Sequence, residues 1–202
     1  MLQTYQGGCV PEDQGFAKLV SLACHDLRTP LATIFGFART LSRAEGLQPT
    51  YVGYSEMIEA ASDQLGELID ELSLAARIEG DRYDPKLDRV STDALAAAAV
   101  ERLGDDRVSV SGQGQEVLVD GETAKRSVSA LVQCALRHGG LEQVAVEVAG
   151  PELRVSPITA SSAPVVLGQD LRDLGAAIAV MHVERLGGSV SVNGDTLTVR
   201  LP

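Results

Sequence analysis

Residues 24–31 read Cys-His-Asp-Leu-Arg-Thr-Pro-Leu, and this stretch lies inside a long amphipathic helical pattern. Apolar residues recur around it at alternating spacings of four and three, which is typical of a helix that packs along a partner helix. The positions that follow this spacing are Val20, Cys24, Leu27, Leu31, Ile34, Ala38 and Leu41. The pattern therefore predicts one long helix with a continuous apolar seam.

The same spacing returns after a break that contains Gly46 and Pro49. Its members are Tyr54, Ile58, Ala61, Leu65, Leu68, Leu72 and Ala75. Two such helices predict an antiparallel helical hairpin over residues 12–82 that is held together by its seams. An apolar flank, widened by Leu19, Leu22, Met57 and Ile69, would stay uncovered in a single hairpin. We therefore expect a homodimer in which two hairpins form a four-helix bundle.

The pattern changes near residue 90, where helical and strand-like segments begin to alternate. Helices are expected over residues 91–103, 121–137 and 171–186. Strands are expected over residues 108–110, 116–119, 143–148, 152–155, 189–192 and 196–201, with a strong turn signal at Asn193-Gly194-Asp195. This order predicts a two-layer α/β sandwich with a mostly antiparallel sheet over residues 90–202. The expected fold class is thus α + α/β.

Composition limits the classes of function and the compartment. The 202 residues are 45% apolar, and the formal net charge of −11 argues against a nucleic-acid partner and against a basic stretch that binds a membrane surface. Cys9, Cys24 and Cys134 have no metal-ligand spacing, which predicts reduced thiols and no metal site. No apolar run is long enough for a membrane span, and the N-terminus does not read as a signal peptide. We expect a cytoplasmic protein that does not contact the membrane.

The stretch at residues 24–31 also carries the candidate chemistry. His25 lies beside the seam and should face solvent, where a neutral imidazole can accept a phosphoryl group. Asp26 can accept the proton of one ring nitrogen, which leaves the other free to attack. Thr29 lies one helical turn after His25, and its hydroxyl could orient a water molecule. Pro30 should bend the helix beside the site, because it lacks an N–H.

These residues resemble the phospho-acceptor box of sensor histidine kinases. Residues 15–80 look like the HisKA-type dimerisation and histidine-phosphotransfer domain of that family, and residues 90–202 resemble its ATP-binding domain. The resemblance implies phosphoryl transfer between His25 and an aspartate of a response regulator. The regulator's receiver domain is then expected to dock near Leu22, Arg28 and Thr33.

The second region departs from the family wherever nucleotide chemistry is expected. Cys134 stands where the family has an asparagine that holds magnesium, and a thiol is a poor ligand for Mg²⁺. Arg137 and His138 keep only the polar character of the positions that follow. The family's Asp-x-Gly-x-Gly turn is replaced by residues 156–161, which contain neither aspartate nor glycine.

The lid and the phosphate turn of the family are altered as well. Residues 162–172 are too few for a full lid. The phosphate turn reads Arg172-Asp173-Leu174-Gly175, where Gly175 is the remaining glycine and Asp173 would repel a triphosphate. We therefore expect a vestigial nucleotide site at Cys134, Arg137, His138 and Gly175. No cofactor is expected, since the partner receiver domain would supply Mg²⁺.

The sequence favours a histidine phosphotransferase that accepts and passes a phosphoryl group on His25, and it leaves three alternatives open. The chain could be an autokinase with a divergent nucleotide site. It could be a response-regulator phosphatase that uses Asp26 and Thr29, or a non-catalytic dimeric pseudokinase scaffold. His138 and His182 are interpreted as ordinary surface or core-edge residues.

Overall fold

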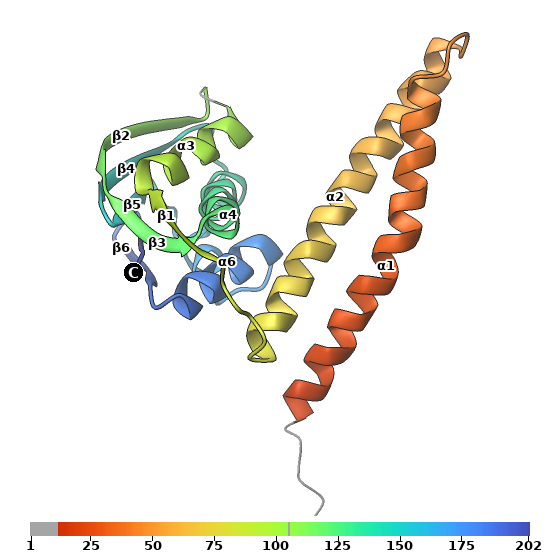
Figure 1. Ribbon diagram of the computed structural model, residues 1–202. Coiled ribbons are helices and arrows are strands. Elements are labelled where there is room, and N and C mark those ends of the chain that lie inside the picture. Colours follow the sequence, from red (N-terminus) through yellow and green to blue (C-terminus); the bar gives the residue numbers. More distant parts are fainter. Residues whose placement is uncertain (1–11, 105) are drawn as a thin grey trace, which may run out of the picture. The chain divides into compact units, whose positions relative to one another are not determined.

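The computed structural model describes residues 12–104 and 106–202. The chain divides after Tyr83 into two compact units, a helical hairpin and an α/β unit (Figure 1). Within the described residues, no helix combines the length and the apolar character that crossing a bilayer requires.

The first unit consists of two long helices that lie side by side, α1 (Glu12–Ser42) and α2 (Pro49–Glu79) (Figure 1). Helix α2 begins with a proline, whose fixed φ and missing N–H suit the first helical turn. It ends at Gly80, whose N–H donates to the carbonyl of Ala76. Helix α1 is continuous through Pro30. The predicted hairpin is confirmed.

Mostly small side chains form the contact between the two helices, with Leu31 and Ile69 as the two large ones. The covered positions recur every seven residues in both helices, with Leu31 half-buried and the others buried: Ala17, Cys24, Leu31 and Ala38 in α1, and Ser55, Ser62, Ile69 and Ala76 in α2. Small residues allow the two helix backbones to approach closely. The hydroxyls of Ser55 and Ser62 are satisfied by the carbonyls of Tyr51 and Ile58, one turn back in the same helix.

The hairpin covers only part of the predicted apolar seams, namely Cys24, Leu31 and Ala38 of α1. Most of the large side chains in both seams are exposed in the single chain: Leu27, Ile34 and Leu41 in α1, and Tyr54, Ile58, Leu65, Leu68 and Leu72 in α2. Ile69 was assigned to the open flank, but it is 7% exposed and lies in the hairpin contact. Two helices cover only one narrow strip of each other. Here the covered strip is the seven-residue repeat of mostly small side chains.

The second unit contains a five-stranded sheet in the order β2-β4-β5-β7-β6. Its strands are β2 (Val108–Gly114), β4 (Val144–Gly150), β5 (Glu152–Ser156), β6 (Ser189–Asn193) and β7 (Thr196–Arg200). Strands β2 and β4 are parallel, and the other neighbours are antiparallel. Strands β1 (Leu87–Ser91) and β3 (Glu116–Asp120) form a separate antiparallel pair.

Helices α3 (Thr92–Leu103), α4 (Gly121–Gly139) and α6 (Leu174–Arg185) cover one face of this sheet (Figure 1). Buried and more exposed residues alternate along β4 and β5, as expected for a sheet with one covered face. The core includes Leu95, Leu131, Leu153 and Leu197, which are all fully buried. The predicted two-layer sandwich is confirmed. The sequence did not reveal β1 or the short helix α5 (Ala163–Val166).

Candidate functional site

His25 is an exposed residue on α1, and its side chain is 77% exposed. The preceding residue, Cys24, is buried in the hairpin contact, so the helical rotation of about 100° per residue turns the imidazole toward solvent. The Nδ1 atom lies 3.2 Å from Oδ1 of Asp26, whose side chain is also exposed. Because Asp26 contacts Nδ1, a neutral ring with its proton on Nδ1 presents the lone pair of Nε2 to an incoming group.

Thr29 and Pro30, about one helical turn after His25, are exposed too. The hydroxyl of Thr33 donates to the carbonyl of Thr29 at 3.1 Å. Pro30 has no N–H, so the carbonyl of Asp26 receives no helical hydrogen bond from position 30. The predicted bend at Pro30 stays a prediction.

Of the three residues expected to contact a receiver domain, Leu22 and Thr33 are exposed. Arg28 already forms an ion pair, because its Nη2 donates to Oδ1 of Asp70 in α2 at 3.0 Å. This ion pair joins the two helices of the hairpin. A partner that uses the Arg28 guanidinium would have to share it with Asp70.

Three of the four residues predicted for a vestigial nucleotide site, Cys134, Arg137 and His138, lie together on α4 of the second unit, and the last two contact Asp173. Cys134 and His138 lie four residues apart on α4, and Nε2 of His138 is 3.2 Å from Oδ2 of Asp173. Nη1 of Arg137 is 3.6 Å from the same oxygen. Burial raises the pKa of the Cys134 thiol to about 12, and the Asp173 carboxylate adds to this effect. Gly175 lies in the first turn of α6.

Asp173 occupies the N-terminus of α6. Its Oδ1 accepts a hydrogen bond from the N–H of Ala176 at 3.0 Å, so it is the N-cap of this helix. The N-terminus of a helix is a favourable place for a phosphate group. Here one of its N–H donors is already bound to a carboxylate, and the charge of that carboxylate opposes a second anion.

Residues 156–172 stand in place of the family's Asp-x-Gly-x-Gly turn and lid, and several of their apolar side chains are buried in the core. The N–H of Ile158 donates to the carbonyl of Asp195, and its side chain is buried. The hydroxyl oxygen of Ser162, just before α5, accepts a hydrogen bond from the N–H of Thr159. Val165 and Val166 of α5 are fully buried. In addition, the sequence contains no Phe, Tyr or Trp after Tyr83, so no aromatic ring of this unit can stack on an adenine.

His182 differs from its expected place, because it lies in the core and not at its edge. It is fully buried, and its Nδ1 is 2.9 Å from the hydroxyl of Ser127. Since that hydroxyl donates to the carbonyl of Thr123, Nδ1 is the donor in the pair, which fixes the neutral tautomer. Burial lowers the pKa of His182 from 6.5 to about 4. His182 is therefore a structural residue.

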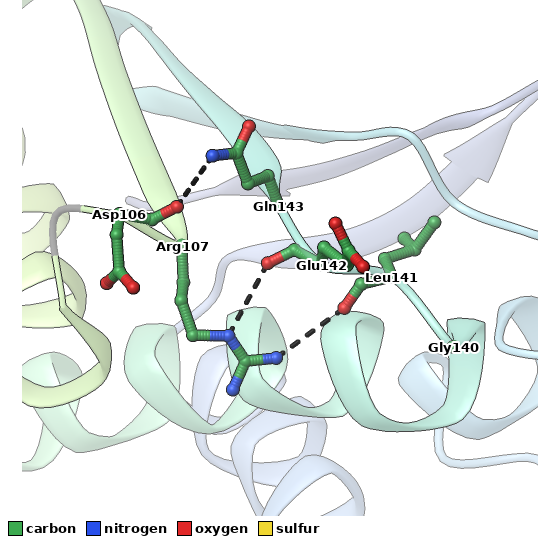
Figure 2. Close-up of a pocket in the computed structure, with 6 residues that line it drawn as sticks. All are labelled: Asp106, Arg107, Gly140, Leu141, Glu142 and Gln143. Carbon is green, nitrogen blue, oxygen red and sulfur yellow. Dashed lines mark hydrogen bonds between the residues drawn. The ribbon is translucent and has the colours of Figure 1, made fainter.

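Figure 2 shows a surface pocket lined by Asp106, Arg107 and residues 140–143. Its polar groups bond to one another: Arg107 donates to the carbonyls of Leu141 and Glu142, and Gln143 donates to the carbonyl of Asp106. These bonds join the beginnings of β2 and β4. The polar groups of this pocket therefore stabilise the pairing of β2 with β4, and few of them are available to bind a ligand.

Sequence reasoning missed that Asp173 lies against Cys134 and His138. The side-chain ligand atoms of these three residues all lie within 4.8 Å of one another, and such a group could hold a metal ion. The Cys-x-x-x-His spacing on one helix face was an available signal for two of the three. The third residue is 35 positions away from His138 and could be found only from the fold.

Comparison with known proteins connects the hairpin to a described family. Residues 17–81 match the family described as the His Kinase A (phospho-acceptor) domain, HisKA. The Sensor protein DivL of Caulobacter vibrioides is 28% identical to this chain, over 88% of the chain and 27% of DivL. The Histidine protein kinase DivJ of the same species is 29% identical, over 86% of the chain and 29% of DivJ. The chain thus spans less than a third of either relative.

Two solved structures share the fold. Full-length ShkA in complex with AMPPNP has a TM-score of 0.67 and 18% identity, over 91% of this chain and 44% of that one. The histidine kinase AdeS of Acinetobacter baumannii has a TM-score of 0.54 and 16% identity, over 88% of this chain and 96% of that one. At these identities the likeness concerns the fold alone.

Proposed function

We propose that this chain, which contains a HisKA phospho-acceptor domain and is homologous to sensor histidine kinases of two-component signalling, is a histidine phosphotransferase. In this role His25 receives a phosphoryl group from the aspartyl phosphate of one receiver domain and passes it to another. The observation that carries the proposal is the contrast between an exposed His25–Asp26 pair and a carboxylate, Asp173, that caps the N-terminus of α6, where the family's phosphate turn would lie.

The transfer step needs only the imidazole and its carboxylate neighbour from this chain. The Nε2 lone pair attacks the phosphorus, an N–P bond forms, and the acyl phosphate P–O bond breaks. The receiver's aspartate leaves as a carboxylate. The proton on Nδ1 stays hydrogen-bonded to Asp26, which stabilises the positive charge that the ring develops. The receiver domain would supply the Mg²⁺ that neutralises the phosphoryl oxygens, so positioning is the main contribution of the hairpin.

The α/β unit is proposed to bind no ATP. Support comes from the Asp173 carboxylate at the N-terminus of α6, from the thiol at position 134 and from the buried Ile158 side chain in the segment that replaces the Asp-x-Gly-x-Gly turn. Each of these opposes a different part of a Mg-nucleotide: the triphosphate, the metal and the base. The unit would then act as a folded support for the docked partner.

A homodimer is part of the same proposal. The exposed apolar side chains on both helices leave a large uncovered surface, which a second hairpin would bury in a four-helix bundle. Such a bundle would display two copies of His25. The exposed face of α1 that carries His25 and the polar Thr33 would remain available for a receiver domain.

A second candidate function is ATP-dependent autophosphorylation with a divergent nucleotide site. It is favoured by the relative DivJ, which is a histidine protein kinase, and by the AMPPNP in the ShkA structure. Isothermal titration with AMPPNP and Mg²⁺ separates the two candidates. Micromolar binding would overturn the proposal that the α/β unit binds no nucleotide.

The two remaining alternatives, a phosphatase and a non-catalytic scaffold, can be distinguished from a phosphotransferase by single substitutions. In a response-regulator phosphatase, Thr29→Ala would abolish dephosphorylation of the receiver and leave transfer to His25 intact. In a pseudokinase scaffold, His25→Gln would leave phosphate flow between receivers unchanged.

The proposal is tested by incubating the chain with a panel of receiver domains that have been labelled with radioactive acetyl phosphate. We expect label to move to the wild-type chain and not to His25→Gln. A matched control is His138→Gln, which should still accept label, because His138 belongs to the other unit. If no receiver in the panel labels the wild type more than His25→Gln, the proposal fails.

A further inference from the structure

Three potential metal ligands of different chemistry meet between α4 and α6. Helices α4 and α6 pack against each other within the α/β unit. Cys134 and His138 are at i and i+4 on α4 and so share one face of that helix. Asp173 is the N-cap of α6. The ligand atoms of all three lie within 4.8 Å of one another.

The separations agree with a common tetrahedral ion. A Zn²⁺ ion holds nitrogen and oxygen ligands at about 2.0–2.2 Å, so two such ligands at the tetrahedral angle lie about 3.4 Å apart. Nε2 of His138 is 3.2 Å from Oδ2 of Asp173. These two atoms therefore need little movement to share an ion, and the Cys134 sulfur lies within 4.8 Å of both.

The chemistry of the three ligands selects the kind of ion. Mg²⁺ and Ca²⁺ prefer oxygen ligands, whereas a thiolate, an imidazole and a carboxylate together suit Zn²⁺. Three protein ligands leave one position of a tetrahedron for water. Cys134 lies at the buried end of the cluster, and the side chains of His138 and Asp173 are 18% and 10% exposed. An ion would thus enter from the side of His138 and Asp173.

The neighbours of the cluster both support and oppose an ion. The Asp173 carboxylate is oriented by the N–H of Ala176 on Oδ1, which leaves Oδ2 for a metal. Nη1 of Arg137 lies 3.6 Å from Oδ2, and its positive charge opposes a cation. The Arg137 side chain is 61% exposed, so it can swing into solvent when an ion binds.

We infer that Cys134, His138 and Asp173 form a zinc site that joins α4 to α6. On binding, the Cys134 thiol loses its proton to solvent as the Zn–S bond forms, and the His138–Asp173 contact is replaced by two bonds to the ion. The site lies where the resemblance predicted only a vestigial nucleotide site. It does not depend on whether His25 carries phosphate. The competing interpretation is a His–Asp hydrogen bond over a buried cysteine, with no role for a metal.

The test is isothermal titration of the full-length, tag-free and metal-stripped chain with ZnCl2. We expect one Zn²⁺ per chain, with affinity reduced more than about 100-fold in Cys134→Ser, His138→Gln and Asp173→Asn. Matched controls are Cys24→Ser and His25→Gln, which change the same residue types in the other unit and should bind as the wild type does. No stoichiometric binding, or binding that survives in the three ligand variants, would overturn the inference.

Two further measurements keep the inference testable if a ligand variant fails to fold. Arg137→Gln removes the opposing charge and should bind Zn²⁺ roughly 3-fold more tightly or better; weaker binding would argue against the site. Zn²⁺ in about 100-fold excess over its Kd should raise the Tm of the wild type by roughly 10 °C, while equal Mg²⁺ should not. Co²⁺ in place of Zn²⁺ should show thiolate-to-metal charge transfer, and its absence would exclude Cys134 as a ligand.

Discussion

The Asp26 carboxylate lies 3.2 Å from Nδ1 of His25, and both side chains are open to solvent. Because Asp26 contacts only Nδ1, the two nitrogens of the imidazole have different roles. Nδ1 holds the proton and its carboxylate partner, and Nε2 is the atom that would carry phosphate in the proposed transfer. Adjacent residues on a helix do not share a face, so the contact depends on Asp26 turning its short side chain back toward the ring.

Asp26→Asn tests this division of tasks. The amide keeps the size of the side chain but removes the negative charge that stabilises the developing imidazolium. We expect phosphoryl transfer from an acetyl-phosphate-labelled receiver domain to slow by about 100-fold, within the range typical of a lost acid–base partner. Quenched-flow labelling of the chain measures the rate. Asp63→Asn on α2 is the control and should transfer at the wild-type rate; equal rates in both variants would show that Asp26 has no part in the step.

Leu65→Glu tests the proposed four-helix bundle. Leu65 is 51% exposed in the single chain and lies in the uncovered apolar seam of α2. Burying a glutamate in a dimer contact without a partner is costly, so sedimentation should show a dimer for the wild type and mostly monomer for the variant. The exposed neighbour Gln64→Glu adds the same charge outside the seam and should remain dimeric. A monomeric wild type, or a variant as dimeric as its control, would contradict the four-helix bundle.

Asp173→Ala tests the cap of α6. Removing the N-cap oxygen leaves the N–H of Ala176 without its partner, and we expect a loss of about 1–2 kcal/mol in the free energy of unfolding. Asp173→Ser restores a capping oxygen and should recover most of the loss. Urea unfolding followed by far-UV circular dichroism, in the presence of a chelator, makes the comparison. If Ser is no better than Ala, capping is not what Asp173 contributes.

His182 predicts how the stability of the α/β unit depends on pH. Its pKa is about 4 in the fold because of burial, below the ordinary value of 6.5, so the unfolded chain takes up the proton first as the pH falls. The stabilisation is complete above about pH 6.5, declines between pH 6.5 and 4, and falls no further below that. The full difference amounts to about 3 kcal/mol.

The measurement compares urea unfolding of the wild type and of His182→Met across this pH range. The variant should lose the part of the pH dependence that lies between pH 6.5 and 4. Tyrosine fluorescence serves as an internal reference for the hairpin unit, because the sequence has no tyrosine after Tyr83 and the α/β unit begins at Asp84. Identical pH profiles for both proteins would show that His182 does not titrate as described.

The sequence allowed the fold to be predicted well because its patterns are local. The 4-3 spacing located both long helices, and turn residues such as Gly194 located the β6–β7 hairpin. The spacing did not say which strip faces inward. The hairpin covers Ser55, Ser62 and Ile69 and leaves Leu65 and Leu68 exposed, a choice that follows from how closely two backbones can approach.

The site could be predicted only where its residues are neighbours in the chain. His25, Asp26 and Thr29 lie within one turn of a helix, so their placement follows from helical geometry. His138 and Asp173 come from different helices and meet through the packing of α4 against α6. The same holds for Ser127 and His182, where a polar pair within the core replaces the expected surface or core-edge histidine.

The most direct test of the central claim compares two phosphoryl donors on the same wild-type chain. One sample receives radiolabelled ATP with Mg²⁺, and the other receives a receiver domain carrying labelled aspartyl phosphate. His25→Gln is included in both to assign the label. The account predicts label on His25 from the phosphorylated receiver and none from ATP. Label on His25 from ATP alone would contradict it, because the α/β unit would then bind and use a nucleotide.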